Sequence, residues 1–295
     1  MIVQVSNTTY FIGVLAAIFA GIVFNLGIVI QKVAVSKIPL ETRLLPQLIR
    51  SPLWLVGFGL QFIIGTPLNM LAQSKIGPAI IPGLMAIGLI VLTVGAVRLA
   101  GEYFDFGDFA GIFLVIMAVI VFGFSKLSVN MQMINIYEPP FLLRLLIFSL
   151  ILAAISVFCH LFQKTNVKLR GILRTLDAGL LLSQSNLWLG ILIVFFSKWS
   201  VEKFIPEDLI LAGISCAIVF AGSMLGIAET QRAFQFGEAS KLIPIQYVPV
   251  QILPILAYFF VFNLRPLTLY SIPFSIGGIV LVMCGAGLLA RRQFA

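Results

Sequence analysis

Residues 79–125 read AIIPGLMAIGLIVLTVGAVRLA (79–100), GEYFD (101–105) and FGDFAGIFLVIMAVIVFGFS (106–125). Two long apolar runs therefore lie on either side of a short turn with two acidic residues. An apolar run of about 20 residues is long enough to cross the hydrocarbon core of a bilayer as a helix. Both runs are continuously apolar rather than alternating, which argues against membrane-spanning strands. The stretch predicts two transmembrane helices joined by a tight turn.

The same pattern extends along the whole chain of 295 residues. Only 10% of the residues are charged and 60% are hydrophobic, whereas a soluble domain has roughly 25% charged and about 45–50% apolar residues. This composition excludes a water-soluble domain and predicts an all-α polytopic membrane protein. Nine runs are long enough for transmembrane helices, with the limits Tyr10–Gln31, Leu53–Gln73, Ala79–Ala100, Phe106–Ser125, Phe141–Gln163, Leu173–Ser197, Leu209–Arg232, Leu242–Asn263 and Leu267–Ala290.

The net charge is +8, and the distribution of the 19 basic residues predicts the orientation of these spans. Lys and Arg are enriched in the cytoplasmic loops of membrane proteins. With the N-terminus outside, 13 of the 19 basic residues fall on the inner side and 6 on the outer side. We therefore expect a multi-pass protein of the cell membrane, with its N-terminus outside, its C-terminus in the cytoplasm, the lipid bilayer as partner and no nucleic-acid partner.

Three short matches indicate an internal repeat. Leu26–Ile30 matches Leu189–Ile193 at an offset of 163, Gly77 matches Gly237 at 160, and Gly123 matches Gly285 at 162. The repeat pairs spans one to four with spans six to nine, and the fifth span links the two copies. Paired helices are five spans apart, so the copies have inverted topology, an arrangement typical of transporters with a binding site near the midplane.

This repeat divides the chain into three parts. We expect a first four-helix repeat over 1–130, a linker loop and fifth transmembrane helix over 131–168, and a second, inverted four-helix repeat over 169–295.

Residues 71–125 resemble the half-repeat of the drug/metabolite transporter (DMT) superfamily. The similarity lies in an Ala-rich helix end, a Pro early in the next helix, Gly101-Glu102 at the turn and a Gly-rich last helix. NLGIVIQKVA (25–34) and RAFQFGEASKLIPIQYVPVQILP (232–254) are similar to the NIPA-like (EamA-like) branch. The resemblance implies a nine-span DMT-type transporter fold and magnesium transport.

The sequence departs from that family at two places. Four-helix relatives use a carboxylate in the middle of the first helix, whereas Phe24 and Asn25 stand there in this chain. The second copy has Asn263-Leu264-Arg265-Pro266 in place of the Gly-Glu turn. The first departure argues against proton–drug exchange through that acidic residue.

Two acids, Asp177 and Glu229, lie clearly inside predicted spans. Ionisable groups within a membrane are costly, so they indicate a functional site by default. Asp177 shares a helix face with Gln184, and the two side chains can line one cavity. The structural alternatives are an interfacial pair of Asp177 with Arg174 and a pair of Glu229 with Arg232.

The eighth span contains three evenly spaced prolines, Pro244, Pro249 and Pro254. Each removes a helical hydrogen bond, and broken backbone occurs at membrane depth only where it is buried or lines a cavity. We therefore expect a broken helix that lines the solute pathway, with a kinked packing helix as the alternative. Pro82 in the third span corresponds to Pro244 at the same offset of 162.

Further polar residues fall within the spans. The full set of candidates for the solute pathway is Asn25, Asn69, Asp177, Gln184, Asn186, Glu229, Gln246, Tyr247, Gln251 and Tyr258. Asn25 and Asn69 can instead serve as hydrogen-bonding contacts between helices. Lys32 is expected to snorkel to the cytoplasmic face, and residues 38–52 are expected to form an interfacial helix.

The sequence contains no motif for catalysis or nucleotide binding, so we expect no enzyme activity and no cofactor. His160 and Cys159 are adjacent on a helix and point in different directions, which makes them a poor metal pair; any metal site stays unknown. The leading hypothesis is a secondary transporter or facilitator of a small solute or Mg²⁺ by alternating access. A DMT/EamA-like metabolite or drug exporter and a non-transporting structural membrane protein are the alternatives, and a homodimer stays open.

Overall fold

The structure is a computed structural model that describes residues 7–40, 42–76, 84–85, 87–103, 105–125, 127, 135–199, 206–266 and 269–292. Within these ranges every regular element is a helix. The helices are α1 (Asn7–Ser36), α2 (Leu44–Arg50), α3 (Pro52–Gly59), the π-helix η1 (Leu60–Gly65), α4 (Thr66–Ile76), α6 (Gly88–Ala100), α7 (Phe106–Phe124), α8 (Pro139–Thr165), α9 (Arg170–Trp199), α10 (Pro206–Ala233), α11 (Ala239–Phe260) and α12 (Ser271–Arg292).

Eight helical segments in the described part of the chain are long and apolar enough to cross a membrane. Each coincides with one of the nine runs expected from hydropathy. The chain is therefore a multi-pass membrane protein. The remaining run, Ala79–Ala100, contains the apolar helix α6, whose 13 residues are too few to span alone; 79–83 and residue 86 lie outside the described residues.

Sequence signals at helix starts agree with several of these boundaries. Asp105 accepts hydrogen bonds from the backbone N–H groups of Gly107 and Asp108, and the Asp108 side chain accepts one from the Asp105 N–H. This reciprocal capping box satisfies N–H groups that a helix start leaves without partners. Pro139 at the first turn of α8 costs no hydrogen bond there. The predicted start of α7 at Phe106 is confirmed.

The chain forms two compact units that do not follow its linear order. Unit 1 comprises residues 1–128, 231–245 and 266–295, and unit 2 comprises 129–230 and 246–265. Unit 1 thus contains the first seven helical elements, α12 and the first turns of α11. Unit 2 contains α8, α9, most of α10 and the rest of α11. The expected division at 130 and 168 concerns sequence repeats and stays a prediction.

Helix α1 is the packing centre of unit 1. Glycines bring its backbone against α6 and α3: a Cβ on Gly88 would lie 2.1 Å from the Gly21 carbonyl oxygen, and a Cβ on Gly57 would lie 2.7 Å from that of Gly27. Real Cβ atoms do not approach backbone so closely, so these sites require residues without a side chain. Close helix contact through small residues is the usual mode of packing in membranes.

The second predicted span is continuous but contains one π-helical segment. Helix α3 passes into η1 and then into α4, and the Thr66 hydroxyl donates to the Gln61 carbonyl at 3.1 Å. Gln61 itself is buried. A π segment inside a longer helix is often found at functional sites, and hydropathy alone does not distinguish it from α-helix.

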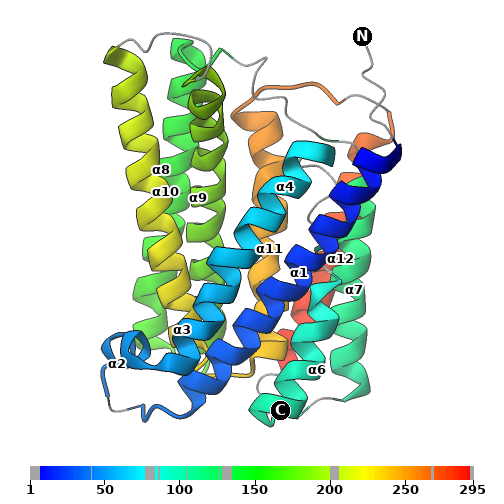
Figure 1. The fold of residues 1–295 in the computed structure, drawn as a ribbon, viewed down its shortest axis with the longest axis vertical. Helices are drawn as coiled ribbons and strands as arrows, with labels where there is room; N and C mark the ends of the chain where they lie inside the picture. Colours follow the sequence, from blue (N-terminus) through cyan, green and yellow to red (C-terminus); the bar gives the residue numbers. More distant parts are fainter. Residues whose placement is uncertain are drawn as a thin grey trace. The chain divides into compact units, whose positions relative to one another are not determined.

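Helices α7 and α12 pack side by side in unit 1 (Figure 1). A Cβ on Gly285 would lie 2.6 Å from the Gly111 carbonyl oxygen, and one on Gly111 would lie 2.6 Å from Leu289 Cγ. The two glycines therefore face each other across the contact. Helices α7 and α12 therefore form a pair although they lie far apart in the sequence.

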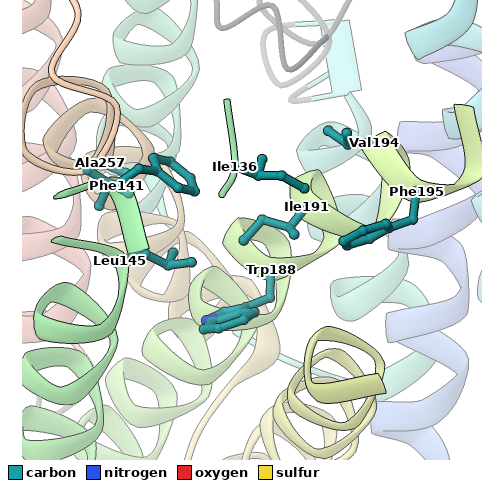
Figure 2. Packing of buried hydrophobic residues seen from close by; sticks show 9 residues of the cluster. Ile136, Phe141, Leu145, Trp188, Ile191, Val194, Phe195 and Ala257 are labelled. Atoms are coloured by element: carbon teal, nitrogen blue, oxygen red, sulfur yellow. The ribbon is translucent and has the colours of Figure 1, made fainter. Parts of the chain in front are cut away.

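Unit 2 has an apolar core between α8, α9 and α11. Figure 2 shows the cluster, which consists of Ile136, Phe141, Leu145, Trp188, Ile191, Val194, Phe195, Ala257 and Val261. The Trp188 indole N–H donates to the Ser149 hydroxyl at 3.0 Å. The one polar atom of this large side chain is thereby satisfied, and the ring fixes α9 against α8.

Small residues also bring α10 and α11 against α9. A Cβ on Gly222 of α10 would lie 3.0 Å from the Leu181 carbonyl oxygen, and the Ser185 hydroxyl lies 2.7 Å from that of Ser223. A Cβ on Gly179 would lie 2.4 Å from Pro249 Cγ. Gly222 and Gly179 therefore allow α10 and α11 to approach α9 closely.

Helix α11 corrects the expectation of an interrupted eighth span. It runs as one α-helix from Ala239 to Phe260, through Pro244, Pro249 and Pro254. Each proline still removes one N–H donor, but packing supports the helix across the gap. The absence of a side chain at Gly179 makes room for the Pro249 ring.

Two residues of the described chain have a left-handed backbone, Gly101 with φ 68° and Asn263 with φ 51°. Gly101 ends α6, and Asn263 follows the end of α11. They are 162 positions apart. Gly and Asn are the residues that most readily adopt this conformation after a helix, so the two turns use the same local chemistry.

The segment expected to be an interfacial helix contains α2. Its Leu44 and Leu48 are buried, whereas Ile49 and Arg50 are exposed. The helix is confirmed; its place at the membrane surface stays a prediction.

Candidate functional site

Asp177 lies buried in unit 2 and faces the helix α8. Its side chain is 3% exposed. The Ser156 hydroxyl donates to one of its carboxylate oxygens, and His160 Nδ1 lies 3.9 Å from the other. Ser156 and His160 stand four residues apart on α8, so both point from one helix face towards Asp177.

Glu229 lies next to this pair and is bound by an arginine. Arg174 Nη1 of α9 donates to Glu229 Oε2 of α10 at 2.6 Å. The sequence raised Arg174 as a partner for Asp177 and Arg232 for Glu229; the pair in the structure is Arg174–Glu229. It ties two helices together within the membrane, where removing one partner of a buried ion pair typically costs about 3–5 kcal/mol.

His160, Asp177 and Glu229 form one polar cluster. One ring nitrogen of His160 and one carboxylate oxygen each of Asp177 and Glu229 all lie within 4.8 Å of one another. The sequence singled out Asp177 and Glu229 but dismissed His160, because the only pairing considered was with its neighbour Cys159. The contact depends on how α8 packs on α9, which a single residue spacing does not reveal.

The cluster lies near one end of the helices that form it. Asp177 is seven residues from the start of α9, a rise of about 10 Å, and Glu229 is four residues from the end of α10. His160 is five residues from the end of α8. The α8–α9 connection follows directly, so the cluster is close to this connection.

A second polar feature of unit 2 is the amide of Gln251 on α11. The residue is 7% exposed, and neither its oxygen nor its nitrogen has a hydrogen-bond partner among the described residues. Gln184 Oε1 on α9 is likewise buried without a partner there. Gln246, by contrast, donates to the Thr230 hydroxyl at 3.0 Å.

The remaining candidates of the eighth span do not share one environment. Tyr258 is buried and its hydroxyl donates to the Arg265 carbonyl at 2.8 Å, a contact that holds the turn after α11. Tyr247 is half-buried and Pro254 is exposed. Asn186 on α9 is exposed as well. The burial of these residues therefore differs, and their place in a solute pathway stays a prediction.

Three glutamines form a buried chain in unit 1 that the sequence did not predict. Gln31 donates to Gln61 Oε1 at 3.0 Å and accepts from Gln231 Nε2. Gln61 Nε2 also donates to the Phe24 carbonyl at 3.1 Å. The partners come from α1, η1 and the end of α10, up to 200 residues apart. The π segment at Gln61 is the local feature that marks this position.

Asn25 of the first span is buried beside that chain on α1. Its Nδ2 donates to the Gly21 carbonyl at 2.8 Å, one turn back on its own helix. Its Oδ1 has no partner among the described residues. The proposed role as a contact between helices is thus not carried by its amide nitrogen. Asn69 on α4 is half-buried, and Pro82 lies outside the described residues.

Lys32 corrects a prediction, because it does not snorkel to the surface. It is 8% exposed, and its Nζ donates to the Phe234 and Gly237 carbonyls at 2.7 and 2.6 Å. Glu102 lies 4.0 Å away. The carbonyls after α10 supply ligands inside the protein, so the ammonium group has no need of water.

Glu102 holds the start of α11. Its carboxylate accepts hydrogen bonds from the Ala239 and Ser240 N–H groups at 2.6 and 2.9 Å and from the Ser240 hydroxyl at 2.6 Å. A helix N-terminus offers unpaired N–H groups and a partial positive charge, both of which a carboxylate satisfies. Nearby, Lys241 Nζ lies 2.7 Å from Glu238 and 3.9 Å from Asp108.

Comparisons with protein-family models, with curated proteins and with solved structures give no match. The DMT and NIPA-like resemblance therefore stays a prediction from sequence.

Proposed function

We propose that this multi-pass membrane protein is a secondary transporter or facilitator of a small polar solute. The observation that supports the proposal is the buried amide of Gln251, which has no hydrogen-bond partner among the described residues. An amide buried in a membrane-spanning helix without any hydrogen bond is costly, yet it offers one acceptor and two donor hydrogens to a solute. No enzymatic reaction and no cofactor belong to this proposal.

The surrounding backbone supports Gln251 as a solute contact. Pro249 and Pro254 flank it on α11, and each lacks the N–H that would serve a carbonyl one turn earlier. Free backbone carbonyls and half-satisfied amides are the groups that transporters use to bind polar cargo. Gln184 on α9 contributes a further unpaired amide oxygen in the same unit.

The proposed architecture is nine transmembrane helices in two inverted four-helix repeats with α8 as the linker. Two facts support it. Gly101 and Asn263 are left-handed at the repeat offset, after the third span of each copy. In addition, the first span of each copy packs on the second and third spans through glycines, at Gly57 and Gly88 for α1 and at Gly222 and Gly179 for α9.

Contacts in unit 1 support the alternation of the spans. Lys32 near the end of α1, Glu102 after α6 and the segment between α10 and α11 all meet. The expected nine-span topology brings these three chain ends to the cytoplasmic side. Alternating access then follows from motion of one repeat against the other.

Organic solutes suit the polar groups of unit 2 better than Mg²⁺. Magnesium prefers octahedral oxygen ligands and loses its water reluctantly. One of the two intramembrane carboxylates, Glu229, is occupied by Arg174. Magnesium, the substrate implied by the family resemblance, is therefore the second candidate. For the first candidate, an organic solute, the resemblance suggests a DMT/EamA-like metabolite exporter.

Uptake into proteoliposomes tests the proposal. The wild-type chain is assayed with labelled amino acids, nucleosides and sugars and with Mg²⁺, beside Gln251→Leu. Leu removes the unpaired amide at similar volume, so the variant should fold at least as stably as the wild type. We expect it to lose at least about tenfold in solute uptake, because one hydrogen bond to a buried polar group is worth about 1.4 kcal/mol or more.

The matched control is Gln47→Leu, the same substitution at an exposed position of α2, which should leave uptake unchanged. Saturable uptake of an organic solute that depends on Gln251 supports the proposal. Flux of Mg²⁺ without uptake of any organic solute would favour magnesium, the second candidate substrate. No flux of any solute above protein-free liposomes would favour the structural, non-transporting alternative.

A further inference from the structure

The α8–α9 hairpin places a histidine against a buried carboxylate. Asp177 is 2% exposed as a residue, while the His160 side chain is 42% exposed. One member of the pair therefore lies inside unit 2 and the other reaches its surface. His160 thus lies between Asp177 and the surface of the unit.

Among the residues that the structure describes, His160 is a basic group within ion-pair distance of Asp177. Its hydrogen-bond donor, the Ser156 hydroxyl, is neutral. The charged groups that act on it are Glu229, His160 and Arg174, and the guanidinium of Arg174 is bonded to Glu229. With His160 neutral, the cation that acts on Asp177 is Arg174, whose guanidinium is hydrogen-bonded to Glu229.

A buried carboxylate such as that of Asp177 is unstable in a medium of low dielectric constant. An unpaired buried charge costs several kcal/mol, and the group avoids the cost by neutralising itself or by pairing. One added proton achieves either outcome: on His160 it creates an ion pair, and on Asp177 it removes the charge.

The Gln163 amide can form a hydrogen bond with His160 both when the imidazole is neutral and when it is protonated. Its Nε2 lies 2.9 Å from His160 Nδ1, and its Oε1 is buried without a partner among the described residues. With neutral His160, the amide N–H donates to the ring nitrogen. When Nδ1 is protonated, a flip of the amide presents the oxygen as an acceptor.

The cluster is less suited to a metal ion. A guanidinium hydrogen-bonded to Glu229 at 2.6 Å places a positive charge on the carboxylate that would have to bind the ion. A proton at His160 and Asp177 leaves the Arg174–Glu229 pair intact.

We propose that His160 and Asp177 together bind one exchangeable proton, and that this proton is the coupling ion of the transporter. The coupling rests on the proposed transport function, whereas proton binding by the pair does not. Ser156, Cys159 and Gln163 face the pair from α8, Arg174 from α9 and Glu229 from α10. The cluster takes up the proton at the aqueous face close to the α8–α9 connection.

The chain contains a single histidine, so nitrogen NMR reads the site directly. Full-length protein with ¹⁵N-labelled histidine and a tag without histidine gives one imidazole, whose nitrogen shifts report protonation and tautomer as pH is varied. Asp177→Asn keeps the shape and removes the negative charge. We expect this variant to alter the pH dependence of the imidazole signals, because it removes the acid that shares the proton with His160 in the proposal.

Glu138→Gln is the matched control, because Glu138 is an exposed acid at the start of the same helix α8. It should leave the histidine titration unchanged, and Ser156→Ala should shift it without abolishing it. A titration that Asp177→Asn does not alter, or an imidazole that stays neutral from pH 5 to pH 9, would overturn the proposal.

Coupling is read separately in proteoliposomes with an imposed pH gradient. If the proton is the coupling ion, the gradient drives accumulation of the transported solute in the wild type, and Asp177→Asn retains only downhill flux. Downhill flux that ignores the gradient overturns coupling while leaving the transport function standing. Absence of all flux overturns the transport function, and the NMR result then stands alone as proton binding.

Discussion

Glu102 shows how much a single carboxylate can hold in this protein. It is buried, lies near Lys32 and accepts three hydrogen bonds from Ala239 and Ser240. Hydrogen bonds to a charged acceptor are roughly twice as strong as neutral ones. The residue therefore joins the end of one helix to the beginning of another that follows much later in the chain.

We predict that Glu102→Gln destabilises the fold by about 3 kcal/mol, a value typical of breaking a buried ion pair. The amide keeps one acceptor oxygen but points a donor at the backbone N–H groups of α11. Unfolding of the purified protein in detergent measures the change. The exposed acid Glu138 gives the control, Glu138→Gln, and equal stability of the two variants would contradict the assigned role of Glu102.

The sequence identified some of the polar residues but few of their partners. Asp177 and Glu229 stood out because acids inside apolar runs are rare, and the structure brings them together. His160 and Gln231 were missed, because their partners lie on other helices and no local sequence pattern predicts those contacts. Lys32 was misassigned because hydropathy treats a lysine at a helix end as facing water.

Among the helices, boundaries were predictable wherever hydropathy changes sharply. The predicted start of α7 at Phe106 matches, and α8 differs from its prediction by two residues at each end. The π segment η1 was not predictable, because its residues are as apolar as their neighbours. The continuity of α11 was not predictable either, since it depends on the space that Gly179 leaves for Pro249.

Two glycines of α12 provide a test of helix packing on one element. A Cβ on Gly285 would lie 2.6 Å from the Gly111 carbonyl, whereas one on Gly287 would meet nothing within 4 Å. We expect Gly285→Ala to cost about 1–3 kcal/mol through overpacking. Gly287→Ala should be neutral or slightly stabilising, because Ala favours helix by about 1 kcal/mol.

Thermal unfolding in detergent compares these two variants with the wild type. A lower midpoint for Gly285→Ala than for Gly287→Ala is the expected order. The reverse order, or identical midpoints, would show that α7 and α12 do not meet at Gly111 and Gly285.

For the whole molecule, compactness and sequence repeats divide the chain differently. Residues 231–245 belong to unit 1, although the residues on both sides of this segment belong to unit 2. Lys32 and Glu102 explain the assignment, because they bind Phe234, Gly237, Ala239 and Ser240. Hydropathy could predict the spans but not this grouping, which depends on contacts between distant residues.

Orientation in the membrane gives a prediction for the whole chain. In a variant without Cys159, Cys216 and Cys284, Val167→Cys should react with a membrane-impermeant maleimide only from the cytoplasmic side. Leu269→Cys should react only from outside. Both positions are exposed and lie in connections that the basic residues assign to opposite faces. Labelling of both from one side would refute the nine-span alternation.

The contacts of Glu102 also have a consequence for synthesis on the ribosome. Ala239 follows Glu102 by 137 residues, which at roughly 5–20 residues per second is a delay of roughly 7–27 s. During this interval the nascent chain carries a lysine and a carboxylate without the backbone groups that later bind them. The glycine face of α7 stays without its partner for longer still, until α12 has been translated, so helices made early are completed by a helix made much later.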